Sequence, residues 1–160
     1  MPQVVRCGII RHMAIATRAI IIENDRILVT FRNKNNSQYF TLVGGRVNDA
    51  ESNEQALVRE IMEETGLQIV SASLVFHEKH HEPYNEQYIY ICQVAPHSDI
   101  AIQETSEEAW LNKSVMHQNI HEPRWVPLSS FEHLPFRTPQ LQQAIVHALK
   151  KGFPKQPIEL

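Results

Sequence analysis

The chain has 160 residues, of which 42% are hydrophobic and 21% are charged, and this composition predicts one globular domain that buries roughly two-thirds of its unfolded surface. The formal net charge of −3 argues against a broad basic surface for nucleic acid. Two cysteines, no apolar run of membrane-spanning length and no signal-peptide pattern exclude a disulfide framework and a membrane protein, so we expect a cytoplasmic protein.

The first part of the chain is predicted to form strands. Residues 1–13 are a leader whose order the sequence leaves open, and the first apolar strand runs from Ile15 to Ile22. A polar turn at 23–25 separates it from a second β-branched run, Ile27 to Phe31, so the two strands are predicted to form a hairpin. After a polar loop, Tyr39 to Val43 forms a short third strand.

A helix is predicted from Asn53 to Thr65. Ser52 and Gln55 form the S-x-x-Q pattern of a capping box, in which each side chain accepts from a backbone N–H at the helix start. Gly66 supplies the left-handed residue that ends a helix.

This helix has an apolar arc and an acidic arc. At ~100° per residue, the apolar side chains fall on one side, namely Leu57, Val58, Ile61 and Met62. The acidic arc holds Glu60, Glu63 and Glu64. Like charges three and four residues apart, and anions in a last turn, destabilise a helix. The acidic arc is therefore either solvated or the binding site of a hard cation such as Mg²⁺ or Mn²⁺.

The whole string GRVNDAESNEQALVREIMEETGL resembles the Nudix box, G-x5-E-x7-R-E-U-x-E-E-x-G-U, where U is a bulky aliphatic residue. Every specified position is filled at the right spacing, by Gly45, Glu51, Arg59, Glu60, Ile61, Glu63, Glu64, Gly66 and Leu67. The chain is thereby identified as a member of the Nudix family. The resemblance implies an α/β/α sandwich, with a mixed sheet on which the box helix packs, in a single domain over 14–152.

The resemblance also implies the roles of the box residues. Glu60, Glu63 and Glu64 would hold Mg²⁺ or Mn²⁺ and serve catalysis, and the carbonyl of Gly44 would join them. Structural support would come from an ion pair that braces the loop against the helix, and from two box glycines, namely Glu51 with Arg59, and Gly45 and Gly66. Val43 and Ala50 depart from the family pattern, because many members have proline and glycine at these two positions.

Arg32 follows the second strand, where family members often place an arginine that faces substrate phosphate. The other reading is a solvated arginine at a strand end. Two further strands, Leu67 to Phe76 and Gln87 to Ala95, are predicted after the helix.

The segment His77–Tyr84 contains three histidines and two glutamates. It is either a transition-metal site or a polar strand end at the rim of a cleft, and whether it touches substrate stays open. In the family, a Pro or a Tyr at this distance from the box is a cue for ADP-ribose or dinucleoside polyphosphate, respectively. Pro83 and Tyr84 satisfy both cues, so the cues do not decide the substrate. Tyr84 is a candidate substrate-binding residue.

The last third is predicted to complete the domain. A short strand is expected at His97–Ile102, followed by an acidic loop where relatives place a further metal-binding or basic carboxylate. In this loop we favour Glu107 as a catalytic residue and expect Glu108 to matter much less than Glu64. A strand at Arg124–Leu128 and a helix that Thr138 caps follow, and Gly152 ends this helix before a loose tail over 153–160.

The resemblance implies hydrolysis of a nucleoside diphosphate linked to another moiety. A nucleoside triphosphate pyrophosphohydrolase is the first expectation, and ADP-ribose and dinucleoside polyphosphates are alternative substrates. A silent module that binds nucleotide is an alternative of another class, but such members typically lose box carboxylates that are all present here. The expected partner is therefore a nucleotide or nucleotide derivative, with no nucleic acid or membrane, and the expected assembly is a monomer or homodimer.

Overall fold

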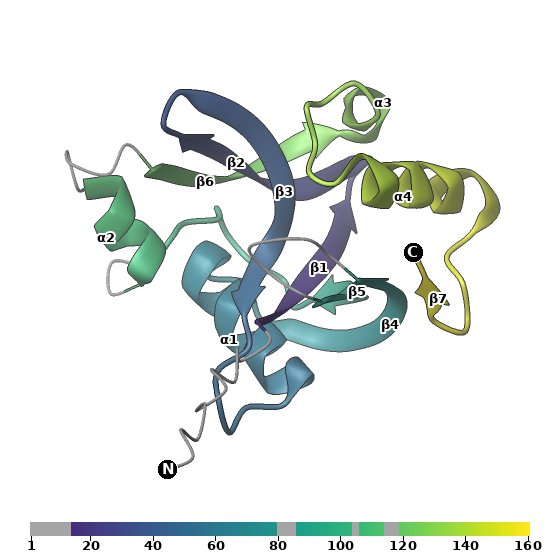
Figure 1. Cartoon of the computed structure of the whole chain (residues 1–160), viewed down its shortest axis with the longest axis horizontal. Helices are drawn as coiled ribbons and strands as arrows, with labels where there is room; N and C mark the ends of the chain where they lie inside the picture. Colours follow the sequence, from purple (N-terminus) through teal and green to yellow (C-terminus); the bar gives the residue numbers. More distant parts are fainter. Residues whose placement is uncertain (1–13, 80–85, 104–105, 114–118) are drawn as a thin grey trace, which may run out of the picture.

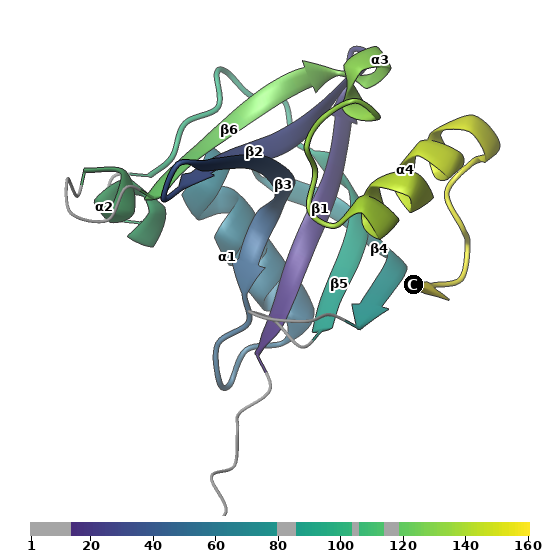
Figure 2. The same cartoon turned by 45° about the horizontal axis from the view of Figure 1, so that its top comes forward.

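The computed structural model describes residues 14–79, 86–103, 106–113 and 119–160. Within these residues the chain forms one mixed sheet with helices on both faces (Figures 1 and 2). The strands are β1 (Ile15–Glu23), β2 (Arg26–Lys34), β3 (Ser37–Arg46), β4 (Ile69–Lys79), β5 (Glu86–Val94), β6 (Asn119–Pro127) and β7 (Ile158–Glu159). The helices are α1 (Asn53–Thr65), α2 (Glu107–Lys113), α3 (Leu128–Phe131) and α4 (Pro139–Lys151). None of the helices in the described ranges is both long enough and apolar enough to cross a membrane.

The sheet has the strand order β6-β2-β3-β1-β5-β4-β7. β1 lies near its centre, parallel to β5 and antiparallel to β3. The predicted hairpin of β1 and β2 is confirmed by the pairing of Ile22 with Ile27, and its turn residues Asn24 and Asp25 adopt φ values of 49° and 58°. The predicted α/β fold with a mixed sheet is therefore confirmed.

Two apolar clusters form because neighbouring residues of a strand point to opposite faces of the sheet. In β1, Ile20 packs in the cluster that α4 covers, together with Leu141 and Ile145. Ile21 packs in the other cluster, against Leu57 and Ile61 of α1. The core is thus a sandwich, and α1 is fixed on the face opposite α4 (Figure 2).

The predicted helix α1 has the predicted ends, with both hydrogen bonds of the capping box at Ser52 and a left-handed Gly66 at φ 75°. Its orientation on the sheet differs from the prediction. Val58 is 49% exposed, whereas Glu60 and Glu64 are buried beside Leu57 and Ile61. The physical reason lies near the end of β3, where Gly45 leaves space for the Glu60 carboxylate and the backbone N–H of Gly44 donates to Glu64.

The predicted strand at His97–Ile102 is wrong, because this segment caps α1 and pairs with no strand. The backbone N–H groups of Ala101 and Gln103 donate to the carbonyls of Thr65 and Glu63, at 3.0 and 2.8 Å. These are carbonyl groups of the last turn, which have no partner inside a helix.

Two elements near the acidic loop differ from the prediction. Glu107 begins α2, because Ser106 Oγ accepts from the backbone N–H of Ala109 at 3.1 Å, as an N-cap does. β6 also begins at Asn119, five residues before the predicted strand start at Arg124.

The tail over 153–160 is not loose, which corrects the prediction. Ile158 pairs with Phe76 in a parallel bridge between β7 and β4, and the N–H of Leu160 donates to the carbonyl of His77 at 2.9 Å. Phe153 and Leu160 pack against the cluster under α4. The two prolines of the tail prevent a continued helix but permit an extended edge strand, which covers the open edge of β4.

Removal of residues 158–160 should therefore lower the Tm by roughly 2 to 8 °C, the shift expected when a domain of this size loses about 1 to 2 kcal/mol of apolar burial and pairing. Calorimetry measures this shift. Glu159→Gln is the control, because it removes only an exposed ion pair with Lys79 and should change the Tm by about 1 °C or less. An unchanged Tm in the truncated protein would show that the tail does not dock.

Candidate active site

The site begins at the close approach of β3 to α1. A Cβ atom on Gly45 would lie 2.5 Å from Cδ of Glu60, and one on Gly44 would lie 2.1 Å from the carbonyl oxygen of Thr17. Gly44 also has a φ of 131°, which L residues rarely adopt. Gly45 is therefore required for the Glu60 carboxylate to lie against the strand, and Gly44 is required for the close approach of β3 to β1.

The predicted ion pair between Glu51 and Arg59 is present. Nε of Arg59 lies 2.6 Å from Oε1 of Glu51 and Nη2 lies 2.9 Å from Oε2, which is a bidentate contact. Nη2 also donates to the carbonyl of Arg46 at 2.9 Å, so Arg59 ties the loop to the helix. The Arg59 guanidinium lowers the pKa of Glu51.

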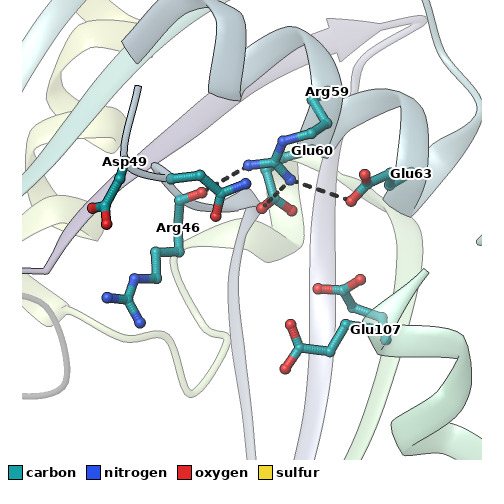
Figure 3. A pocket seen from close by; sticks show the side chains of 8 residues that line it. Arg46, Asp49, Arg59, Glu60, Glu63 and Glu107 are labelled. Atoms are coloured by element: carbon teal, nitrogen blue, oxygen red, sulfur yellow. Dashed lines mark hydrogen bonds and ion pairs between the residues drawn. The ribbon is translucent and has the colours of Figure 1, made fainter. Parts of the chain in front are cut away.

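Arg59 also contacts two box carboxylates (Figure 3). Nη1 lies 2.9 Å from Oε1 of Glu60 and 3.3 Å from Oε2 of Glu63. Figure 3 shows Arg59 between these two carboxylates, with Glu107 across the cavity from them. One guanidinium therefore offsets part of the repulsion along the acidic side of α1.

Glu60 and Glu64 are buried carboxylates. Burial raises the pKa of Glu60 to about 7, although Arg59 opposes the shift, and it raises the pKa of Glu64 to about 8, although the N–H of Gly44 donates to its Oε2 at 2.8 Å. Oε2 of Glu60 is buried and has no hydrogen-bond partner among the described residues. Without a cation, the folded site thus favours protonated carboxyl groups near neutral pH.

Glu108 and His121 bring two further side chains to Glu64. One potential ligand atom from each of the three residues lies within 4.8 Å of the others. Burial raises the pKa of Glu108 and lowers the pKa of His121 to about 3, and the nearby cations Arg32 and Arg18 add to the lowering for His121. The imidazole is therefore neutral at physiological pH.

Two cavities that share four lining residues lie at these groups. The outer cavity, of about 350 Å³, is lined by Arg46, Asn48, Asp49, Arg59, Glu60, Glu63, Glu107 and Glu108. The inner one, of about 210 Å³, is lined by Arg18, Arg32, Gly44, Gly45, Arg46, Glu60, Glu64, Glu107, Glu108, Leu111, Asn119 and His121. Carboxylates and arginines thus face the same space, which can hold a cation and phosphate groups together.

The predicted site residues do not all have the same place in this space. Glu60 lines both cavities, Glu64 only the inner one and Glu63 only the outer one. Glu107, which the sequence favours, is exposed and lines both, whereas its neighbour Glu108 is the one that meets Glu64.

Three further predicted positions have different outcomes. Arg32 lines the inner cavity and donates to Oδ1 of Asn119 at 3.1 Å. The carbonyl of Gly44 accepts from Nη1 of Arg18 at 2.7 Å, so a cation would share this oxygen with an arginine. Tyr84 lies outside the described residues.

The two residues that depart from the family pattern lie in different parts of the structure, Ala50 in the loop before α1 and Val43 in β3. Ala50 adopts a φ of 65°, where family members often have glycine, and an alanine there costs about 1 to 2 kcal/mol. Val43 is fully buried in the cluster under α1.

Sequence reasoning missed Arg18 and His121. Arg18 is only 8% exposed, and its Nε donates to Oε1 of Gln87 at 3.0 Å. A charged residue inside an apolar strand is a signal that could have identified Arg18. His121 has no such signal, because it lies between Ile120 and Glu122 and not inside an apolar run.

The side chains present fit a divalent cation. Oε2 atoms of Glu60 and Glu108 and Nε2 of His121 are buried without a hydrogen-bond partner in the described part of the chain, and such atoms are costly unless a ligand satisfies them. Carboxylate oxygens suit Mg²⁺ and Mn²⁺. Glu60, Glu64, Glu108 and His121 are therefore the residues that could hold the ion.

The chain is similar to Nudix proteins of known structure. One is a MutT protein from Methanosarcina mazei, with 20% identity and a TM-score of 0.62 over 86% of this chain and 96% of that one. Another is a Nudix hydrolase from Nitrosomonas europaea, with 18% identity and a TM-score of 0.63 over 89% of this chain and 93% of that one. An ADP-ribose pyrophosphatase from Streptococcus suis is also similar, with 18% identity and a TM-score of 0.59 over 92% of this chain and 98% of that one. At these identities the likeness shows the fold.

No curated protein matches the chain at a significant level of sequence similarity. The family model for the NUDIX domain matches residues 13–149, which is most of the chain. With the complete box and the shared fold, this match shows that the chain belongs to the Nudix family.

Proposed function

We propose that the chain is a metal-dependent hydrolase that cleaves the pyrophosphate bond of a nucleoside diphosphate linked to another moiety. The observation that carries this proposal is the set of buried carboxylates that share one cavity with three arginines, Arg18, Arg32 and Arg46. Carboxylates alone would repel a pyrophosphate, and arginines alone would not activate it. A cation between the two sets makes the cavity complementary to a phosphate chain.

The resident ion would be Mg²⁺ or Mn²⁺, held by Glu60, Glu64 and Glu108, with Glu63 at the outer rim. When bound, the ion neutralises charge that develops on the leaving phosphate and lowers the pKa of water. Arg59 and Glu51 position the helix that carries the glutamates, and Arg18 fixes the backbone of Gly44, whose N–H orients Glu64.

An arginine that lines the inner cavity would bind the phosphates. Arg32 is held in the cavity by Asn119, and its guanidinium would donate charge-assisted hydrogen bonds to phosphate oxygens. Glu107 is exposed and lines both cavities. It would accept the proton of the attacking water, because a general base must reach both water and the reacting phosphate.

A nucleoside triphosphate is the substrate we propose first, and ADP-ribose and dinucleoside polyphosphates are the alternatives. Similar structures include both a MutT protein and an ADP-ribose pyrophosphatase, so they favour neither. A catalytically silent module is disfavoured because Glu60, Glu63 and Glu64 are all present. We further propose that the protein acts in the cytoplasm, as a monomer or homodimer, without nucleic acid or membrane.

The direct test is a panel of nucleoside triphosphates, ADP-ribose and dinucleoside polyphosphates, with detection of released phosphate through coupling enzymes. Hydrolysis should require Mg²⁺ or Mn²⁺ and should stop in excess chelator. Glu64→Gln should lower kcat at least ~10²-fold, the usual effect of removing a positioned catalytic group. Glu132→Gln, which changes a carboxylate outside both cavities, should have no effect. Full turnover in chelator, or no hydrolysis of any substrate with either ion, would refute the proposed function.

Glu107 and Glu108 are neighbours whose proposed roles differ, so the same substitution should give two different kinetic results. Glu107→Gln should lower kcat about 10² to 10⁴-fold with little change in the metal concentration for half-maximal rate. Glu108→Gln should raise that metal concentration ~10-fold or more, because it removes a ligand. Metal titrations at saturating substrate separate the two effects. If the effects are exchanged, the roles of the two residues are exchanged as well.

A further inference from the structure

His121 stands out among the residues of the inner cavity. Its side chain is on β6, where His121 pairs with Arg32 of β2, and it is only 8% exposed. Nε2 is buried and has no hydrogen-bond partner in the described part of the chain. A ring nitrogen of His121 lies within 4.8 Å of a carboxylate oxygen of both Glu64 and Glu108. A buried polar atom without a partner requires an explanation, and a ligand would supply one.

Two hydrogen bonds hold the backbone of His121 in place. Asn112 of α2 makes two hydrogen bonds to it, in which its Nδ2 donates to the carbonyl of His121 and its Oδ1 accepts from the N–H, both at 2.7 Å. Glu108 lies four residues before Asn112, so it is on the same face of α2, one turn away. The contact that docks α2 on β6 therefore also places the Glu108 carboxylate beside the imidazole.

The distances are compatible with a shared ion. Ligand atoms bound at about 2.1 Å to one ion lie at most about 4.2 Å apart, so the three side chains would need only small rotations to close on it. Glu64 and Glu108 come from two different helices and His121 comes from a strand. Three independent elements thus converge on this point, which a solvated acidic face does not explain.

We propose that His121 supplies a nitrogen ligand to the ion held by Glu64 and Glu108, and that this ligand makes the cavity prefer a transition ion such as Mn²⁺ or Co²⁺ over Mg²⁺. Mg²⁺ binds oxygen ligands almost exclusively and gives up its waters reluctantly, whereas imidazole nitrogen binds the transition ions well. The inference deepens the proposed function, because it concerns the same cavity and names the metal that the cavity selects.

The simpler alternative is that His121 is structural, filling space beside carboxyl groups. Under that alternative, replacing it would weaken the binding of every ion alike, or of none. The two accounts therefore differ in the ratio of Mn²⁺ to Mg²⁺ affinity and in the identity of the atoms bound to Mn²⁺. Neither readout needs a substrate, so a failure of hydrolysis and a failure of this inference are distinguishable.

The decisive measurement is electron spin-echo envelope modulation of Mn²⁺ bound to the chain without any histidine tag. The wild-type complex should show modulation from an imidazole ¹⁴N nucleus, and His121→Asn should lose it. His97→Asn is the matched control, because His97 lies outside both cavities and contacts Glu23. This variant should keep the ¹⁴N modulation. Wild-type protein that binds Mn²⁺ without ¹⁴N modulation, or that binds no Mn²⁺, overturns the inference, and this result does not depend on whether a variant folds.

Competition titrations give the second readout. The ratio of Mg²⁺ to Mn²⁺ dissociation constants should fall at least ~10-fold in His121→Asn, the loss expected for one ligand or its close support, and should be unchanged in His97→Asn. Circular dichroism and the Tm of each variant verify that the comparison is between folded proteins. An equal loss of affinity for both ions would show that His121 is structural.

Discussion

The burial of two carboxylates between α1 and the end of β3 is the constraint on which the site depends. Glu60 and Glu64 are turned toward the sheet, where Gly44 and Gly45 leave no room for a side chain of their own. Burial of unpaired carboxylates is unfavourable, so the surrounding structure must compensate. Arg59 pairs with Glu60, and the N–H of Gly44 holds Glu64, but neither contact restores the ordinary pKa.

This residual cost connects the fold to its proposed chemistry. A cavity whose carboxyl groups resist ionisation releases protons when a cation enters, and the cation then gains the interactions that water cannot provide. Arg18 and Arg32 face the same cavity and would receive the phosphate chain. The α2 helix completes the arrangement, because it brings Glu107 and Glu108 to both cavities and places Glu108 beside Glu64 and His121. Binding of the metal and of the substrate therefore depends on the half of the sheet formed by β6, β2, β3 and β1, together with α1 and α2.

Local signals in the sequence were sufficient to predict α1 and its two ends, because Ser52, Gln55 and Gly66 bond to backbone groups only a few residues away. The side of α1 that is buried was not predictable from periodicity, which assumes that apolar residues face inward, whereas Glu60 and Glu64 do so here and Val58 does not. Convergence of Glu108 and His121 depends on the docking of α2 on β6, a contact between segments that no local pattern connects. The edge strand β7 likewise exists only because β4 presents an open edge.

The most direct test of this account is the stability of the metal-free protein against pH. Burial raises the pKa values of Glu60 and Glu64 from 4.5 to about 7 and about 8, so the native state binds protons more tightly than the unfolded chain. The two buried carboxyl groups should therefore make the free energy of unfolding highest at low pH. Their contribution should fall by several kcal/mol as the pH rises from about 4.5 to about 8, at ~1.4 kcal/mol for each unit of pKa shift. His97, whose pKa is also raised, and Glu60 are present in both wild type and Glu64→Gln. The difference between the free energies of unfolding of the two proteins therefore isolates the contribution of Glu64. The account predicts that Glu64→Gln gains stability relative to wild type as pH rises, and that saturating Mn²⁺ removes most of this gain. A difference that is independent of pH, or a wild-type advantage that grows with pH in the absence of metal, would contradict it.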